Sequence, residues 1–146
     1  MSDVYRTRFV SGEHAGALVI HCSDPTFQPH FQEFLREHLG LDHYALLAVP
    51  GGSQLLTLVE YLPKFGWAGW RWIKFLVDVA RPTRVILLTH ENCLWYRDSR
   101  FSHSSPEQQH TDLVKVRAEF AERFPGIAVE LYAARHDGGH VAFSRL

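Results

Sequence analysis

Short apolar runs alternate with amphipathic segments along this chain, which is the pattern of strands and helices in turn. Runs rich in aliphatic residues predict strands over 17–22, 43–50 and 84–89, each followed by polar residues or glycine. The apolar positions after the first run recur at intervals of three and four, which predicts a helix from Phe27 that stops before Gly40. Strands that alternate with helices are typical of a parallel sheet covered on both faces.

The rest of the chain predicts three further helices and a closing hairpin. These elements are a short helix over 53–60 capped by Ser53, helices over 67–80 and 107–124, a polar loop over 91–106, and strands over 127–135 and 140–145. The last two strands flank Asp137-Gly138-Gly139 and pair as an antiparallel hairpin. The predicted fold class is therefore α/β, a three-layer α/β/α domain with a mainly parallel sheet and a C-terminal hairpin. Residues 1–146 form a single domain in this prediction, with residues 1–16 as an N-terminal arm.

Composition narrows the range of partners. The chain has 146 residues, 46% of them hydrophobic, which is enough for one domain with its own core. Its formal net charge of -1 and the lack of a Lys/Arg cluster predict no nucleic-acid and no membrane partner. No stretch has the length of a membrane span and the first residues lack a signal-peptide pattern, so we expect a cytoplasmic protein. The aromatic cluster Trp67, Trp70, Trp72 and Phe75 is interpreted as helix packing or as a buried subunit interface.

The only two cysteines follow two of the predicted strands. Cys22 ends the first run, and Cys93 comes three residues after His90, which follows the third run. Neighbouring parallel strands end at the same edge of a sheet, where open α/β sheets carry their ligand sites. Thiolate and imidazole are preferred zinc ligands, and a catalytic zinc leaves its fourth position to water or substrate. The pattern predicts a zinc site of these three residues; the alternative is two buried, inert cysteines beside a histidine bonded to backbone.

Two further features lie next to these residues. Asp24 follows Cys22 by two positions, and its carboxylate can hold a zinc-bound water or become the fourth ligand. Its ordinary alternative is to cap the helix that begins near Pro25. The pair Gly51-Gly52 after the second strand permits close backbone approach, but without G-x-G-x-x-G spacing it is poor evidence for phosphate binding.

Together, Cys22-Ser23-Asp24, Gly51-Gly52 and His90-x-x-Cys93, followed by a helix and a hairpin, resemble the β-class carbonic anhydrase family over nearly the whole chain. The resemblance implies zinc as the cofactor, with Cys22, His90 and Cys93 as ligands and Asp24 as the catalytic carboxylate. It implies carbon dioxide or an analogue as the substrate. It also implies a homodimer or a higher homo-oligomer, which in this family often forms through an N-terminal arm.

The chain departs from the family pattern at two places. The family pairs its aspartate with an arginine in a C-x-D-x-R motif, and Thr26 occupies the arginine position here. Leu94 and Trp95 occupy positions that are commonly glycine, which predicts a bulkier pocket wall. A carboxylate beside a divalent cation is drawn to the metal unless another charge restrains it, so Thr26 favours Asp24 as a fourth ligand.

Two functions follow as competing hypotheses. In the first, the protein is a zinc-dependent lyase, in which a zinc-bound hydroxide attacks carbon dioxide, carbonyl sulfide or carbon disulfide while Asp24 orients it. In the second, Asp24 completes a closed four-ligand zinc site that serves structure or binding without turnover. The candidates for the proton carrier are His21, His30 and His103, and those for the missing arginine are Arg71, Arg97 and Arg100.

Overall fold

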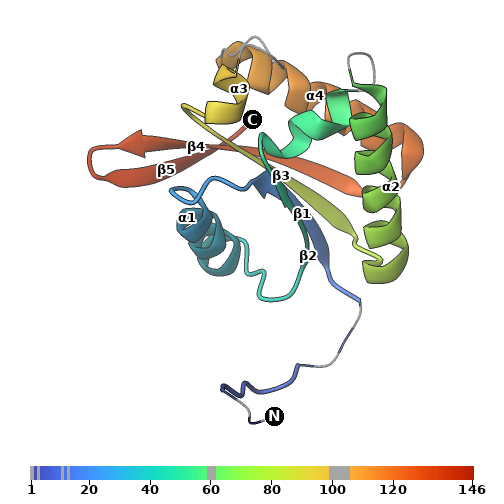
Figure 1. The fold of residues 1–146 in the computed structure, drawn as a ribbon, viewed down its shortest axis with the longest axis vertical. Coiled ribbons are helices and arrows are strands. Elements are labelled where there is room, and N and C mark those ends of the chain that lie inside the picture. Colours follow the sequence, from blue (N-terminus) through green and yellow to red (C-terminus); the bar gives the residue numbers. More distant parts are fainter. Residues whose placement is uncertain (1, 3, 11, 13, 59–61, 99–105) are drawn as a thin grey trace.

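A five-stranded sheet with the order β2-β1-β3-β4-β5 runs through the middle of the domain (Figure 1). The computed structural model describes residues 2, 4–10, 12, 14–58, 62–98 and 106–146. The strands are β1 (Ala17–Cys22), β2 (Ala45–Val49), β3 (Arg84–His90), β4 (Ala128–Asp137) and β5 (His140–Arg145). Four strands are parallel to one another, and β5 pairs antiparallel with β4. The predicted mainly parallel sheet and its C-terminal hairpin are confirmed.

Helices cover both faces of this sheet. One face carries α1 (Gln28–Glu33) and its π-helical continuation η1 (Phe34–His38), and the other carries the 3-10 helix η2 (Gly52–Thr57), α2 (Pro63–Ala80) and α4 (Pro106–Arg123). The four-residue helix α3 (Leu94–Arg97) follows β3 within the segment that was predicted as a polar loop. The three-layer α/β/α architecture is confirmed.

Alternate residues of the central strands supply two separate cores. Leu18 and Ile20 of β1 pack with Trp70 of α2, whereas Val19 packs with Phe31 of α1 on the opposite face. All six residues of β1 are buried, which explains why the strand is a continuous apolar run rather than an alternating one. Each fully buried aliphatic side chain contributes about 1.5–3 kcal/mol to the free energy of unfolding.

The first helix spans the predicted residues but changes its winding near the end. The Leu39 amide donates to the Phe34 carbonyl at 3.1 Å, five residues back, and Gly40 ends the helix at φ +66°. The wider turn lets two consecutive side chains face the sheet. The ring of Phe34 stacks on that of Phe143 with the ring centroids 4.1 Å apart, and Leu35 is fully buried. The predicted stop at Gly40 is confirmed.

The prediction that Ser53 caps the helix after β2 is wrong. Ser53 lies inside η2 and does not cap it, because Gly51 and Gly52 have φ values of +75° and +58° and the helix begins at Gly52. These left-handed conformations are open to glycine at little cost. Glu60, the predicted end of this helix, lies outside the described residues.

The helix α2 begins earlier than predicted and packs only part of its aromatic residues. Pro63 provides a favourable first residue, and Arg81 in the left-handed conformation ends the helix. Trp70 is buried, and its Nε1 donates to the Leu56 carbonyl at 3.1 Å. Trp67 and Phe75 remain 65% and 64% exposed, so helix packing accounts for Trp70 alone. None of the described helices has the length and apolar character that crossing a bilayer requires.

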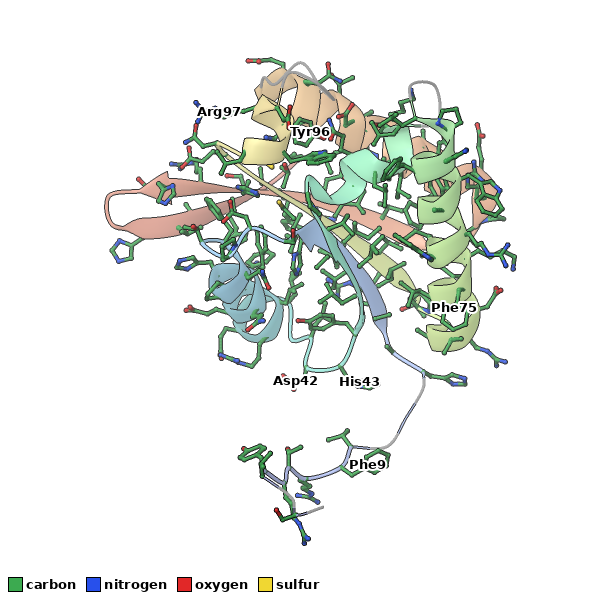
Figure 2. All side chains as sticks on the ribbon, viewed as in Figure 1. Phe9, Asp42, His43, Phe75, Tyr96 and Arg97 are labelled. Carbon is green, nitrogen blue, oxygen red and sulfur yellow. The ribbon has the colours of Figure 1, made fainter. Side chains whose placement is uncertain are left out.

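The N-terminal arm leaves the body of the domain (Figures 1 and 2). Near its root the Ala15 amide donates to the Ala80 carbonyl at 2.8 Å, and the His43 ring bonds the Gly12 carbonyl at 3.0 Å. Beyond these contacts Phe9 and Tyr5 are 86% and 84% exposed. The described part of the arm therefore presents apolar side chains to its surroundings.

We expect Gly52→Ala to destabilise the domain more than Gly40→Ala. Both glycines have left-handed φ values, but a Cβ at Gly52 would lie 3.0 Å from the backbone of His21 and Cys22, whereas nothing lies within 4 Å at Gly40. The conformational cost alone is about 1–2 kcal/mol at either site, and the added contact at Gly52 costs about 1–3 kcal/mol more. Urea unfolding of both variants measures the difference. Equal losses of stability would contradict the close approach at Gly52.

Candidate metal centre

Three potential ligands meet at the carboxyl edge of the parallel sheet. Cys22 is the last residue of β1, His90 is the last residue of β3, and Cys93 begins the turn into α3. One ligand atom from each lies within 4.8 Å of the other two, and all three residues are buried. The structure thus brings together the three residues that the sequence predicted as zinc ligands.

The separation of the two sulfurs fits a tetrahedral zinc ion. Cys22 Sγ and Cys93 Sγ are 3.8 Å apart. Two sulfurs that each lie about 2.3 Å from a zinc ion in tetrahedral geometry are separated by about 3.8 Å. The sulfurs therefore already stand at the spacing that a shared zinc requires.

The imidazole of His90 is oriented to supply a nitrogen ligand. Its Nδ1 bonds the Glu91 carbonyl at 2.9 Å, which fixes that nitrogen as the donor, and its ring lies 4.4 Å from the Phe27 ring. Its Nε2 is buried without a hydrogen-bond partner among the described residues. A ring nitrogen of His90 lies within 4.8 Å of both sulfurs, so the imidazole can bind a metal ion that the two thiolates also bind.

The surroundings of the two thiols favour different protonation states in the metal-free protein. The hydrogen bond from Cys22, opposed by burial and aided by the amides of Tyr96 and Trp95, lowers the pKa of Cys93 to about 6. The same bond and burial raise the pKa of Cys22 to about 12. Burial disfavours the charged form of His90, but its contacts with Cys22 and Glu91 outweigh burial and raise its pKa. A metal bound here replaces these protons, because its ligands are thiolates and neutral imidazole.

The two glycines after β2 form one wall of this centre. The Gly51 amide donates to Cys22 Sγ at 3.4 Å, and Gly52 packs against the backbone that carries Cys22. The indole of Trp95 lies against Gly51, where any Cβ would collide with it. Of the two bulky residues after Cys93, Trp95 contacts the cysteines, whereas Leu94 is 71% exposed. Of these two residues, only Trp95 therefore forms part of the wall of the centre.

Glu91, the residue after His90, is hydrogen-bonded to β4. The Glu91 amide donates to the Ala134 carbonyl at 3.0 Å, and the Glu91 carboxylate accepts bonds from the His136 amide and, at 2.8 Å, from its ring Nδ1. The bond from the His136 amide is the largest cause of the lowered pKa of Glu91. The sequence analysis missed this pair, because Glu91 carries no pattern that distinguishes it from other polar loop residues.

Asp24 lies beside the three-residue group and is not a member of it. Its Oδ1 accepts a hydrogen bond from the Thr26 amide at 2.7 Å. This is an Asx turn rather than a helix cap, since α1 begins at Gln28 and its Ncap, Phe27, makes no side-chain bond. Asp24 is near enough for its charge to act on His90 and Cys93.

The other candidates from the sequence lie in different surroundings. His21 is buried beside Phe31, and burial lowers its pKa, while His30 is half-buried on α1. Arg71 stacks over Trp67, and Arg97 points away from the domain (Figure 2). No ion pair joins Asp24 to an arginine within the part of the chain that the structure describes. His103 and Arg100 lie outside that part.

Comparison with solved structures identifies this arrangement of elements. The β-carbonic anhydrase CafA of the fungal pathogen Aspergillus fumigatus aligns with a TM-score of 0.50 and 13% identity, over 91% of this chain and 76% of that one. The chain has the β-carbonic anhydrase fold. A carbonic anhydrase of Streptococcus mutans aligns with a TM-score of 0.48 and 14% identity, over 94% and 87% of the two chains. β-Carbonic anhydrase isoform I of the protozoan Trichomonas vaginalis aligns with a TM-score of 0.46 and 14% identity, over 95% and 87%.

No protein-family model matches the sequence, and no curated protein matches it either. The likeness to the β-carbonic anhydrase fold therefore stands on the arrangement of the sheet and its helices. Within that fold, Cys22, His90 and Cys93 form a group that could hold a metal ion.

We expect each single cysteine variant to bring the remaining thiol back toward an ordinary pKa in the metal-free protein. Cys22→Ala removes the donor that stabilises the Cys93 thiolate, so the pKa of Cys93 rises from about 6. Cys93→Ala removes the main cause that holds the proton on Cys22, so the pKa of Cys22 falls from about 12. Thiolate absorbance measured against pH checks both directions. A Cys93 titration that is the same with and without Cys22 would show that the two thiols do not share a proton.

Proposed function

We propose that this protein is a zinc-dependent lyase that hydrates carbon dioxide or a close analogue such as carbonyl sulfide or carbon disulfide. The observation that carries the proposal is the buried Cys22/His90/Cys93 group, with its sulfurs at a tetrahedral spacing, in a β-carbonic anhydrase fold. Bound zinc would supply the Lewis acidity that lets a coordinated water lose a proton near neutral pH. The two thiolates donate strongly to the metal, so this acidity is modest and the neighbouring residues must assist.

In this proposal Asp24 gives that assistance. The Thr26 amide holds its Oδ1, which leaves Oδ2 to accept a hydrogen bond from water at the metal's fourth position. This backbone bond restrains the carboxylate at the very position where the resembling family uses an arginine. The restraint is a single neutral hydrogen bond, which is weaker than a bidentate ion pair.

The alternative function is a closed zinc site without turnover. Asp24 would then exchange its bond to Thr26 for the metal and become the fourth ligand beside Cys22, His90 and Cys93. The observation that favours this alternative is that no described arginine pairs with Asp24. Such a site would stabilise the fold and activate no water.

Zinc content and carbon dioxide hydration of the same purified protein test the proposal. We expect one zinc per chain and hydration above the buffer rate between about pH 6 and about pH 9, both lost in Cys93→Ser. We expect Thr26→Arg to raise the rate by about tenfold or more, because a charged partner restrains Asp24 better than an amide does.

The two functions give different results in this experiment. Full zinc content without hydration would overturn the lyase and leave the closed site, in which case Asp24→Asn should increase water exchange at the metal. Protein that takes up no zinc would overturn both.

We also propose that the protein acts as a homodimer or a higher homo-oligomer and is located in the cytoplasm. The exposed apolar side chains of the arm support the assembly, since Phe9 lies well away from the domain (Figure 2) and both Phe9 and Tyr5 are more than four-fifths exposed. The two free thiols support a reducing compartment.

We expect the double variant Tyr5→Ser and Phe9→Ser to shift the protein toward the monomer in light scattering coupled to size-exclusion chromatography. Both side chains are more than four-fifths exposed in the single chain, so their loss removes contact with another copy and leaves the domain intact. Val114→Ser on α4, where the valine is 37% exposed, is the control and should keep the assembly. Equal molar masses for all three proteins would exclude an assembly through the arm.

A further inference from the structure

Cys93 lies on the short segment between the end of β3 and α3. Cys93 follows Asn92, which has a left-handed φ of +54°, and it precedes the four-residue helix α3. Helices this short have little stability of their own. The sulfur of Cys93 is therefore held in place by whatever fixes α3 to the rest of the domain.

Tyr96 provides one such attachment. It points from α3 into the domain, whereas its neighbour Arg97 points outward (Figure 2). The Tyr96 hydroxyl donates to Asp112 Oδ2 of α4 at 2.7 Å, and the Gln108 side chain donates to Asp112 Oδ1 at 2.8 Å. Tyr96 and Asp112 are only 3% and 5% exposed. A hydrogen bond of this length to a buried carboxylate is among the stronger ones in a protein.

The same tyrosine also contacts the two sulfurs. Tyr96 packs with Cys22 and Cys93 in one buried cluster, and its backbone amide favours the thiolate of Cys93. One residue thus joins the carboxylate on α4 to both sulfurs.

Removal of the hydroxyl would affect both ends of this connection. The buried Asp112 carboxyl group would have one hydrogen-bond donor fewer, and leaving a buried acceptor unsatisfied is costly. The segment would relax this cost by moving α3 or α4 so that water reaches the carboxylate. A movement of α3 would carry Cys93, its N-cap residue, away from its 3.8 Å separation from Cys22.

We propose that Tyr96 and Asp112 are positioning residues for the metal centre, which together hold Cys93 at the spacing that zinc needs. This inference rests on the proposed zinc site and extends it to a hydrogen bond that touches neither the metal nor a substrate. Outer partners of metal ligands commonly change metal affinity by about 10–100-fold when they are removed.

Zinc affinity measured by competition with a chelator tests this inference on the full chain. We expect Tyr96→Phe and Asp112→Ala each to weaken zinc binding by about 10–100-fold, and the double variant to bind no more weakly than the worse single one. In cobalt-substituted protein, the sulfur-to-cobalt absorption bands of both variants should shift.

Tyr132→Phe is the control, since it removes the hydroxyl of another buried tyrosine, which donates to the Glu130 carboxylate at 2.7 Å. It should leave the zinc affinity and the cobalt spectrum unchanged. Wild-type affinity in Tyr96→Phe, or an equal loss in Tyr96→Phe and Tyr132→Phe, would overturn the positioning role while the zinc site itself stands. If Tyr96→Phe does not fold, Asp112→Ala decides by the same criteria. Wild-type protein that binds no zinc would instead overturn the proposed function, and the positioning role with it.

Discussion

The parallel pairing of β1 with β3 is the contact on which the metal centre depends. Ile20 lies opposite Leu87 in this pairing, and two residues further along β1 the chain reaches Cys22. Parallel strands end at the same edge, so the pairing delivers Cys22 and His90 to one place although they are far apart in the sequence. A shift of register by one residue would turn these side chains to opposite faces and remove the site. The fully buried apolar residues of both strands specify the register.

The rest of the centre depends on the close approach of the Gly51-Gly52 backbone to Cys22. Gly52 packs on the chain at Cys22, and Gly51 directs its amide at the sulfur and leaves room for the indole of Trp95. Trp95 and Tyr96 then hold α3 from two sides, one by shape and one by a hydrogen bond. The centre is therefore held by packing and by hydrogen bonding, and both reach the sulfur ligands themselves.

Features that depend on the local sequence pattern could be predicted. Features that depend on contacts between elements far apart in the sequence could not. Aliphatic runs identified β1 and β3, and cysteine and histidine at their ends identified the candidate ligands. The cap assigned to Ser53 failed because two adjacent left-handed glycines start η2 one residue earlier. The hydrogen bond between Tyr96 and Asp112 joins residues on separate helices, so no spacing in the sequence predicts it. The role of Asp24 stays a prediction. It depends on whether the carboxylate keeps its hydrogen bond from the Thr26 amide or binds the metal ion instead.

The spacing of the sulfurs has a further consequence for the lifetime of the site. At 3.8 Å the two sulfurs are too far apart for a covalent S–S bond, which requires about 2.05 Å, so a disulfide between them would require one sulfur to move toward the other. A zinc ion bound by both sulfurs, as proposed, would prevent that movement and would keep their electron pairs from reacting with an oxidant. Zinc binding and disulfide formation would then exclude each other.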